Sequence, residues 1–303
     1  MIQLVICTAT LLFRVGLLRI PFVQRLAVNI YCRLLYPLVL HRIFHLQHAI
    51  VNIDGYRFCV PLGDRGGIGM ATLGYPAKSY MASVFKQVVK PGMTVVDIGA
   101  YVGYYTIIAS KIVGNSGKVF SFEPDPSNYS ILLRNIEANR CHNVVSIQKA
   151  VSDRSGHLIF FLNPIDSTCH TLYPLEGRGV KKISVECCKL DDLLADERVE
   201  IIKMDIEGAE LVALQGMTRT LAYNPDIILF IELQPTNLKR AGASPLDLIT
   251  FLEEQNFEVF LIDEERGRLI GGIADMPPRH KESNLLCVRG AKAYGLVNHV
   301  ITC

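Results

Sequence analysis

Tryptophan is absent from the 303-residue chain, and so are low-complexity tracts and internal repeats at the periods that solenoid proteins use. The nine cysteines are an odd number, and no two of them have the Cys-x-x-Cys spacing of a zinc site or a redox motif. These absences argue against a repeat protein, a zinc framework and a secreted domain held by disulfides. We therefore expect reduced thiols and a cytoplasmic protein.

The body of the chain also lacks an excess of basic residues. The formal net charge is +2, but residues 1–53 contain five arginines and no Asp, Glu or Lys. The remaining residues carry 26 basic and 29 acidic side chains, a net charge of −3. Proteins that bind nucleic acid usually present a basic surface, so we expect no nucleic-acid partner.

The glycine motifs that hold phosphate groups are incomplete. In "TVVDIGAYVGYYT" a dinucleotide-binding Gly-x-Gly-x-x-Gly that begins at Gly99 would need glycine where Tyr101 and Tyr104 stand. No Gly-Lys-Ser/Thr follows, so the sequence does not fit a phosphate loop of the NTPase type either. A nucleotide-sugar or NAD-dependent oxidoreductase is therefore the weaker alternative for this chain.

The first 54 residues are far more apolar than the rest, and we interpret them as a helical appendage. The first apolar run, residues 2–13, is too short to span a bilayer, which needs about 20 residues. Residues 21–37 place Arg25, Asn29 and Arg33 on one narrow strip with apolar flanks, a pattern typical of a helix in a membrane interface. We expect residues 1–40 to contact a membrane surface; packing on the body or on a partner subunit, and a spanning anchor, are the alternatives.

Strands and helices alternate along the rest of the chain. Seven main strands are predicted, at 94–98, 118–122, 144–149, 200–204, 226–232, 257–263 and 284–288. Helices are predicted at 78–89, 104–113, 126–139, 209–221 and 245–255, and two short strands at 157–162 and 182–187 form an insertion. This order indicates an α/β fold with a Rossmann-like, mostly parallel sheet whose last strand is antiparallel.

The domain organisation follows from the same pattern. Residues 1–54 form the apolar appendage, and residues 55–75 are glycine-rich and read as an irregular connector. Residues 76–290 form the α/β domain, and residues 291–303 a C-terminal tail. Parallel sheets bind ligands outside the carboxyl ends of their strands, so the residues just after each strand are the site candidates.

The bend after the first main strand suits a nucleoside that carries no phosphate. Asp97, Gly99, Ala100 and Gly103 form Asp-x-Gly-Ala-x-x-Gly, a tight turn before a helix N-terminus that favours an anionic group. Glu123 ends the next strand, where a carboxylate can accept both hydroxyls of a ribose. A nucleoside with a free diol and a carboxylate, but no phosphate, is S-adenosylmethionine, and we expect this cofactor.

Four stretches, taken in order, resemble the FkbM-type family of S-adenosylmethionine-dependent methyltransferases over about residues 75–290: "VVDIGAYVGYYT", "GKVFSFEPDPSNYSILLRNIEAN", "AVSDRSG" and "IIKMDIEGAELVALQG". The resemblance implies a seven-stranded class I methyltransferase sheet and O-methylation of a sugar, glycan or polyketide hydroxyl. It also implies that Asp97, Gly99 and Gly103 form the loop at the methionine end, that Glu123 binds the ribose, and that Asp153 lies near the adenine. A turn residue is the alternative interpretation of Asp153.

Methyl transfer to a hydroxyl needs a positioned acceptor and benefits from a base. "KMDIEGAE" places Lys203, Asp205 and Glu207 on one face of an extended segment after the fourth main strand. We predict Asp205 as the base or the acceptor-orienting group, Glu207 as the next candidate and Lys203 as electrostatic support. Carboxylates this close should raise the pKa of at least one of them.

Three further residues keep open interpretations. Glu210 either joins this cluster or caps the following helix. We assign no metal ligand, although Asp205 and Glu232 together could hold a hard divalent cation; His170 is an alternative base. The acceptor is a small molecule, a glycan or a lipid-linked group, and a non-catalytic module that binds S-adenosylmethionine is a further alternative.

Overall fold

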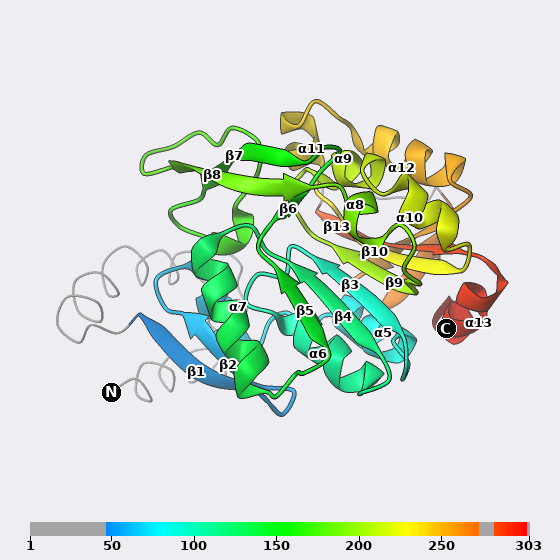
Figure 1. Ribbon diagram of the computed structural model, residues 1–303, viewed down its shortest axis with the longest axis horizontal. Helices are drawn as coiled ribbons and strands as arrows, with labels where there is room; N and C mark the ends of the chain where they lie inside the picture. Colours follow the sequence, from blue (N-terminus) through cyan, green and yellow to red (C-terminus); the bar gives the residue numbers. More distant parts are fainter. Residues whose placement is uncertain (1–46, 273–281, 302–303) are drawn as a thin grey trace.

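An eight-stranded mixed sheet runs through the part of the chain that the computed structural model describes, residues 47–272 and 282–301 (Figure 1). Its strand order is β12-β11-β13-β10-β9-β3-β4-β5. The strands are β3 (Thr94–Ile98), β4 (Lys118–Phe122), β5 (Val144–Ile147), β9 (Ile201–Met204), β10 (Ile227–Leu233), β11 (Glu258–Asp263), β12 (Arg268–Gly271) and β13 (Ser283–Arg289). Neighbours from β5 to β10 pair in parallel, and β13 is antiparallel to β10 and β11.

The predicted fold is thereby confirmed, with one addition. All seven predicted strands are present and the last of them is antiparallel, as expected. The eighth strand, β12, pairs antiparallel with β11 at the edge of the sheet. The chain order reverses between β3 and β9, because β4 and β5 follow β3 on one side while β10 follows β9 on the other. Ligands of such sheets bind at this reversal.

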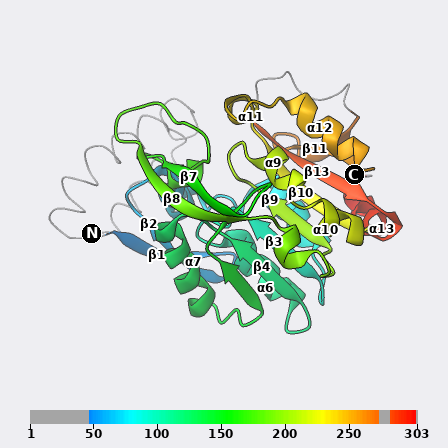
Figure 2. The same cartoon turned by 45° about the horizontal axis from the view of Figure 1, so that its top comes forward.

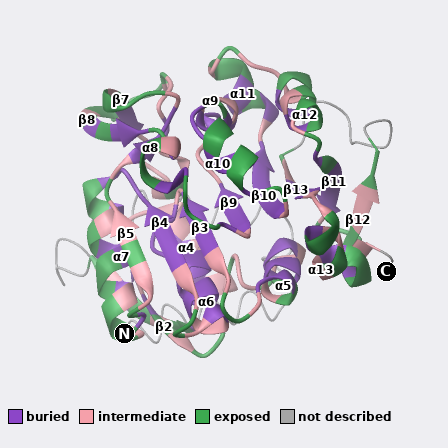
Figure 3. Cartoon of the chain, turned by 45° about the vertical axis from the view of Figure 1, so that its right-hand side comes forward, coloured by how far each residue is buried: buried purple, intermediate pink, exposed green. Residues whose placement is uncertain are grey.

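Consecutive residues of the central strands supply two separate hydrophobic cores. Val95 and Ile201 pack on one face of the sheet, and Val96 and Ile202 pack on the other. A parallel strand buried on both faces is largely apolar, which is the pattern of "TVVDI" and "IIKM" apart from Asp97 and Lys203, which face each other across β3 and β9. Figure 3 shows these central strands as the buried interior of the molecule.

Helices cover both faces of the sheet. The first core includes side chains of α5 (Tyr80–Val88), α6 (Tyr104–Val113), α7 (Pro126–Ala138) and α13 (Ala291–Ile301). The second core includes side chains of α8 (Asp191–Leu194), α9 (Glu210–Gln215), α10 (Thr218–Tyr223), α11 (Pro235–Arg240) and α12 (Pro245–Glu254). Residues 291–303, predicted as a tail, thus supply a helix whose Ala293, Val297 and Val300 are buried in the first core.

Local capping sets where several helices begin. The Asp125 side chain accepts hydrogen bonds from the backbone N–H groups of Ser127 and Asn128, and Pro126 occupies the first turn of α7. Ser244 and Asp247 form a capping box at the start of α12. Each side chain satisfies N–H groups that have no partner within the helix, so these boundaries follow closely from the sequence.

The predicted helix over 209–221 is wrong in one respect, because it is two helices, α9 and α10. Gly216 ends α9, and a β-carbon at this position would overlap the backbone oxygen of Ser152. At Gly216 the chain therefore lies directly against the segment that follows strand β6 (Ala150–Val151). This long-range contact interrupts a helix that periodicity alone predicts as continuous.

The connector predicted as irregular over 55–75 contains regular structure. A hairpin of β1 (His48–Ile53) and β2 (Tyr56–Pro61) is followed by α4 (Arg65–Leu73). The hairpin lies against α7 (Figure 1), where Asn135 exchanges two hydrogen bonds with the backbone of Cys59 and Asn139 exchanges two with Arg57. Gly67 in α4 serves close packing, because a β-carbon at this residue would overlap the backbone oxygen of Pro61.

The insertion between β5 and β9 forms a small sheet of order β6-β8-β7. Its strands β7 (Gly156–Leu162) and β8 (Lys181–Cys188) confirm the two predicted short strands, and a 3-10 turn, η3 (Ser167–Cys169), lies between them. Figure 2 shows this sheet beyond the edge of the large one. The insertion therefore supplies the second wall of any cavity at that edge.

The apolar appendage falls almost entirely outside the described residues. Residues 1–46 are not described, so the predicted interfacial helix stays a prediction. Within residues 47–272 and 282–301, no helix is both long and apolar enough to cross a membrane.

Candidate active site

The turn between β3 and α6 depends on glycine. Gly99 has a φ of +80° and Gly103 a φ of +92°. Residues that carry a β-carbon rarely adopt this backbone conformation. A β-carbon at Gly99 would overlap the backbone oxygen of Asp205, so this turn and the segment after β9 meet backbone to backbone. The buried Ala100 donates its N–H to the oxygen of Phe122, 2.9 Å away. The predicted glycine turn therefore links three strand ends.

Asp97 supports this turn from the interior. It is 1% exposed, and its Oδ2 accepts a hydrogen bond of 2.6 Å from the hydroxyl of Thr106 in α6. Its Oδ1 lies 3.9 Å from Nζ of Lys203. Burial raises the pKa of Asp97, and the Lys203 charge and the Thr106 hydrogen bond oppose that rise. Asp97 thus ties β3 to α6 and to β9.

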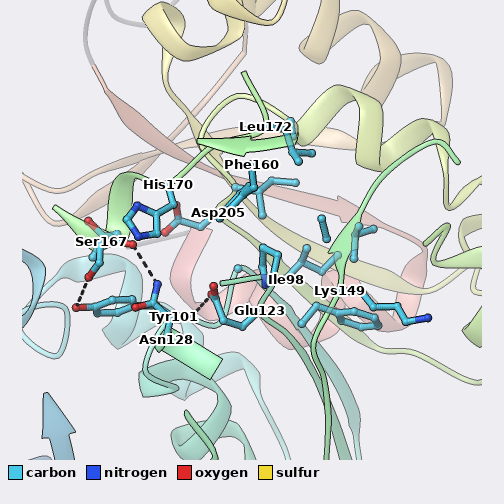
Figure 4. A pocket seen from close by; sticks show the side chains of 18 residues that line it. Ile98, Tyr101, Glu123, Asn128, Lys149, Phe160, Ser167, His170, Leu172 and Asp205 are labelled. Atoms are coloured by element: carbon cyan, nitrogen blue, oxygen red, sulfur yellow. Dashed lines mark hydrogen bonds between the residues drawn. The ribbon is translucent and has the colours of Figure 1, made fainter. Parts of the chain in front are cut away.

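Glu123 is fixed at the carboxyl end of β4. Its Oε2 accepts the N–H of Tyr101 at 2.8 Å, and its Oε1 accepts the N–H of Asp125 at 3.0 Å (Figure 4). Burial raises the pKa of Glu123 to about 8, although both backbone hydrogen bonds favour the charged form. Each carboxylate oxygen has a second lone pair, so a rigid acceptor for two hydroxyl groups faces the cavity beside it.

A cavity of about 530 Å³, open to solvent, lies between these strand ends and the insertion (Figure 4). Its walls are Ile98, Gly99, Tyr101, Phe122, Glu123, Pro124, Asn128, Lys149, Ala150, Val151, Phe160, Ser167, Thr168, His170, Leu172, Asp205, Ile206 and Ala209. One side is apolar and the other carries the carboxylates of Glu123 and Asp205.

The cavity brings together only some of the predicted residues. Gly99, Glu123 and Asp205 line it. Asp97, Ala100 and Gly103 lie in the supporting turn and do not line it. Asp153 is not a lining residue; its backbone lies beside Gly216, and its predicted place near the adenine stays a prediction.

Tyr101 stands where the resemblance to the FkbM-type family leads us to expect Asn at a residue that shapes the cofactor pocket, and it lines the cavity. It adopts a φ of +53°, and its hydroxyl lies 3.3 Å from Oγ of Ser167. Several other lining residues were not predicted. Asn128 donates from Nδ2 to the backbone oxygen of Ser167 at 3.2 Å. Phe160 and Leu172 of the insertion form part of the apolar side. Only Asn128, in the first turn of a predicted helix beside Glu123, carried a sequence signal.

A group of acids follows β9 beside the cavity. Lys203 is 3% exposed, and its Nζ lies 3.3 Å from Oδ2 of Asp205. Burial alone would lower the pKa of Lys203, but the carboxylates of Asp205 and Asp97 outweigh it, so the pKa is raised. The side chain of Asp205 is 43% exposed, which leaves it accessible from the cavity.

Glu207 is more enclosed than its neighbour. Burial, together with the charge of Asp205, raises the pKa of Glu207 to about 8. Its Oε2 accepts a hydrogen bond from Nδ2 of Asn237, and its backbone oxygen accepts one from Thr171 at 2.9 Å. Its φ of +56° is uncommon for a residue with a side chain, so these contacts hold it in a strained conformation.

Glu210 and Glu232 complete the acidic group. Oε1 of Glu210 accepts the N–H groups of Ile206 and Gly208 at 3.1 and 3.2 Å. These N–H groups belong to the turn before α9, and the helix has no side-chain cap, so Glu210 holds the turn and does not cap the helix. Burial raises the pKa of Glu210 to about 7 and that of Glu232 well above its ordinary value. One carboxylate oxygen each of Asp205, Glu207 and Glu232 lies within 4.8 Å of the other two.

His170 lines the cavity but is held by the insertion. Its Nδ1 accepts the backbone N–H of Asn163 at 3.0 Å, and its ring packs edge-on against Phe160. Burial lowers the pKa of His170. These contacts use one ring nitrogen structurally, and the role of an alternative base stays a prediction.

The residues around the cavity suit the predicted nucleoside. Glu123 offers fixed acceptors for a diol, and Ile98, Phe160 and Leu172 offer apolar contacts for a base ring. Together with the strand order, this site defines a Rossmann-like class I methyltransferase. The model of the Methyltransferase FkbM domain matches residues 97–259, more than half of the chain, and the protein belongs to this family. Its cofactor is S-adenosylmethionine, as the sequence predicts.

Two curated relatives are methyltransferases. The hexuronic acid methyltransferase AglP of Haloferax volcanii is 27% identical over 186 residues, which cover 58% of this chain and 68% of AglP. The methyltransferase sdnD of Sordaria araneosa is 28% identical over 155 residues, which cover 41% of this chain and 60% of sdnD. An S-adenosylmethionine-dependent methyltransferase structure from Aquifex aeolicus overlaps 74% of this chain and 98% of its own, at a TM-score of 0.44 and 16% identity. The family assignment decides against the oxidoreductase alternative.

Proposed function

We propose that this methyltransferase methylates a hydroxyl group of a sugar, either free or within a glycan or a lipid-linked acceptor. The observation that carries the proposal is the position of Asp205, which lines the cofactor cavity and also belongs to the cluster of carboxylates at the ends of β9 and β10. A group that orients or deprotonates an acceptor must reach the acceptor hydroxyl while its oxygen lies in line with the methyl group of the cofactor. Carboxylates are also common hydrogen-bond acceptors for hydroxyl groups.

The cofactor would be held by residues of the cavity. Glu123 would accept the ribose hydroxyls, the turn at Gly99 would lie beneath the methionine end, and Phe160 and Leu172 would flank the base. When bound, S-adenosylmethionine supplies an electrophilic methyl group. Asp153, which lies near the start of the insertion, stays a candidate for contact with the adenine.

The acids after β9 would prepare the acceptor. The acceptor oxygen forms a bond to the methyl carbon, the carbon–sulfur bond breaks, and the hydroxyl proton passes to a carboxylate. Asp205 is the accessible carboxylate and Lys203 fixes its orientation. Glu207, with its pKa raised to about 8, would serve as a base near neutral pH.

The sugar class is supported by the relative AglP, whose name gives a hexuronic acid as its substrate. In this chain the three clustered carboxylates disfavour a further negative charge beside them. We therefore propose neutral sugar hydroxyls as better acceptors than free uronic acids.

Transfer of a radiolabelled methyl group tests this function directly. The full-length protein is incubated with labelled S-adenosylmethionine and a panel of neutral glycosides, glucuronides and aliphatic amines. We expect label in an ether-linked methyl group on a glycoside. Asp205→Asn should lower kcat at least 100-fold and change the affinity for S-adenosylhomocysteine less than threefold, because Asp205 is one of many cavity residues.

Glu254→Gln, an exposed acid on α12, is the matched control and should keep wild-type activity. Label on the amines alone, or full activity of Asp205→Asn, would refute the proposal. Loss of cofactor binding in every variant would point instead to a folding defect, which circular dichroism identifies.

A further inference from the structure

Three carboxylates converge at neighbouring strand ends, and the part of the chain that the structure describes supplies a single cation beside them. β9 and β10 pair in parallel with Met204 opposite Ile231, so Asp205 and Glu232 follow at the same level of the sheet. Glu207 approaches from the turn after β9. One oxygen atom of each carboxylate lies within 4.8 Å of the other two.

Among the described residues, only one member of this cluster has a cationic partner. Nζ of Lys203 lies 3.3 Å from Asp205, and its other carboxylate contact is Asp97. In residues 47–272 and 282–301, no Lys, Arg or His nitrogen lies within 4.0 Å of the carboxylates of Glu207 or Glu232. Glu207 has a neutral partner, the amide of Asn237.

Glu232 is the member that lacks a partner. It is 8% exposed, and its Oε2 has no hydrogen-bond partner among the described residues. A buried carboxylate without a donor or a cation is costly, and buried charges in proteins are normally paired or bound to metal ions. Glu232 therefore has an unfilled requirement for a positive ligand, and it faces the other two carboxylates.

We propose that Asp205, Glu207 and Glu232 bind one hard divalent cation of the Mg²⁺, Mn²⁺ and Ca²⁺ class. An all-oxygen set of carboxylates is what these ions prefer, whereas zinc favours nitrogen and sulfur. Two oxygens bound to one ion at about 2.3–2.6 Å lie at most roughly 5 Å apart, so the present spacing admits an ion with little movement. Water or acceptor oxygens would fill the remaining positions.

The position of the site gives the bound ion a role in methyl transfer, and this role rests on the proposed function. Asp205 belongs both to this cluster and to the wall of the cofactor cavity, so the ion would lie on the acceptor side of that cavity. A divalent cation bound to a hydroxyl oxygen lowers the pKa of that hydroxyl and fixes its position.

Manganese binding tests the site without reference to activity. The full-length protein, dialysed against a chelator, is titrated with Mn²⁺, and free Mn²⁺ is followed by electron paramagnetic resonance. We expect one Mn²⁺ per chain, displaced by Mg²⁺ or Ca²⁺. Glu232→Gln keeps the shape of the side chain and should weaken binding at least tenfold, while Glu254→Gln should bind as the wild type does.

The two proposals fail in different ways. No binding of Mn²⁺ by the wild type at millimolar concentration, or equal binding by Glu232→Gln and the wild type, would overturn the metal site. The wild-type measurement stands even where a variant does not fold, and Glu207→Gln provides a second test with the same expected loss. Methyl transfer to sugars by a protein that binds no Mn²⁺ would overturn the metal site alone, whereas Mn²⁺ binding without transfer to any hydroxyl would overturn only the proposed function.

Discussion

Gly99 occupies the position where the cofactor turn meets the segment that carries Asp205. A β-carbon there would overlap the backbone oxygen of Asp205, and the φ of +80° disfavours any side chain. We predict that Gly99→Ala destabilises the protein more than Gly74→Ala, because Gly74 also has a left-handed conformation but would meet only the side chain of Lys78 at 3.4 Å.

The difference is measurable by thermal unfolding. Left-handed strain alone costs about 1–2 kcal/mol, which corresponds to a fall in Tm of roughly 2–3 °C for a chain of this size. Gly74→Ala should fall in that range, and Gly99→Ala should lose at least twice as much and also bind S-adenosylhomocysteine more weakly. Equal losses in the two variants would contradict the backbone contact.

Glu123 makes the stability of the protein depend on pH. Burial raises the pKa of its folded-state carboxyl to about 8, above the ordinary value of 4.5. Between these two values the folded chain holds a proton that the unfolded chain releases, so the stability contributed by this group is present below about pH 4.5 and is lost as pH rises through about 8. Glu207 and Glu210 act in the same direction.

A comparison with Glu123→Gln isolates the contribution of this residue. We predict that unfolding free energies measured without cofactor shift in favour of the variant as pH rises from 5 to 8.5, by at most about 1.4 kcal/mol per pH unit. Urea unfolding of both proteins at four pH values provides the test. A constant difference across this range would show that the pKa of Glu123 is not raised.

At the scale of elements, the insertion and α4 are joined across the cofactor cavity. Oγ of Ser167 in η3 donates to Oδ2 of Asp64, the N-cap of α4, at 2.5 Å, and the N–H of Arg65 donates to the oxygen of Ile165 at 3.0 Å. These contacts hold η3 in the cavity wall. We predict that Ser167→Ala weakens binding of S-adenosylhomocysteine about 5- to 100-fold, because it leaves the largely buried Asp64 carboxylate short of a donor, a loss of about 1–3 kcal/mol.

Ser155→Ala is the matched control for this contact. Ser155 lies in the same insertion, its hydroxyl contacts the exposed Asp192, and it does not line the cavity. Isothermal titration should give this variant the affinity of the wild type. A similar loss in both variants would mean that the insertion as a whole is destabilised.

At the scale of the molecule, the β1–β2 hairpin and α4 belong to the body that carries the site. Phe58, Val60 and Met70 lie in the first hydrophobic core, together with residues of α5 and α6. We predict that a chain of residues 47–303 folds and binds S-adenosylhomocysteine, whereas residues 76–303, cut at the domain boundary that the sequence predicts, unfold or aggregate. Size-exclusion chromatography and thermal unfolding of the two chains decide where the domain begins.

The same chain of residues 47–303 tests the predicted membrane contact of residues 1–40. If the interfacial helix exists, the full-length protein should sediment with vesicles that contain anionic lipid, and residues 47–303 should stay in solution. Equal sedimentation of the two proteins would place the membrane contact elsewhere or exclude it.

The sequence by itself determined seven strands of the sheet and the cofactor turn. Strands such as β3 are largely apolar and helices such as α7 begin at capping residues, so both are encoded in short stretches. The Asp97–Gly103 motif and Glu123 were likewise readable, because a turn that needs glycine and an acid at a strand end are local features.

Only the tertiary structure decided which side chains meet. Tyr101 and Ser167 are 66 residues apart, and neither carries a local signal that the other lies beside it. Residues 55–75 are predicted as an irregular connector because the sequence does not show that Gly66 and Gly67 serve the close packing of α4. The convergence of Glu207 and Glu232 depends on the pairing of β9 with β10 and on a strained turn, both of which are set by contacts between distant parts of the chain.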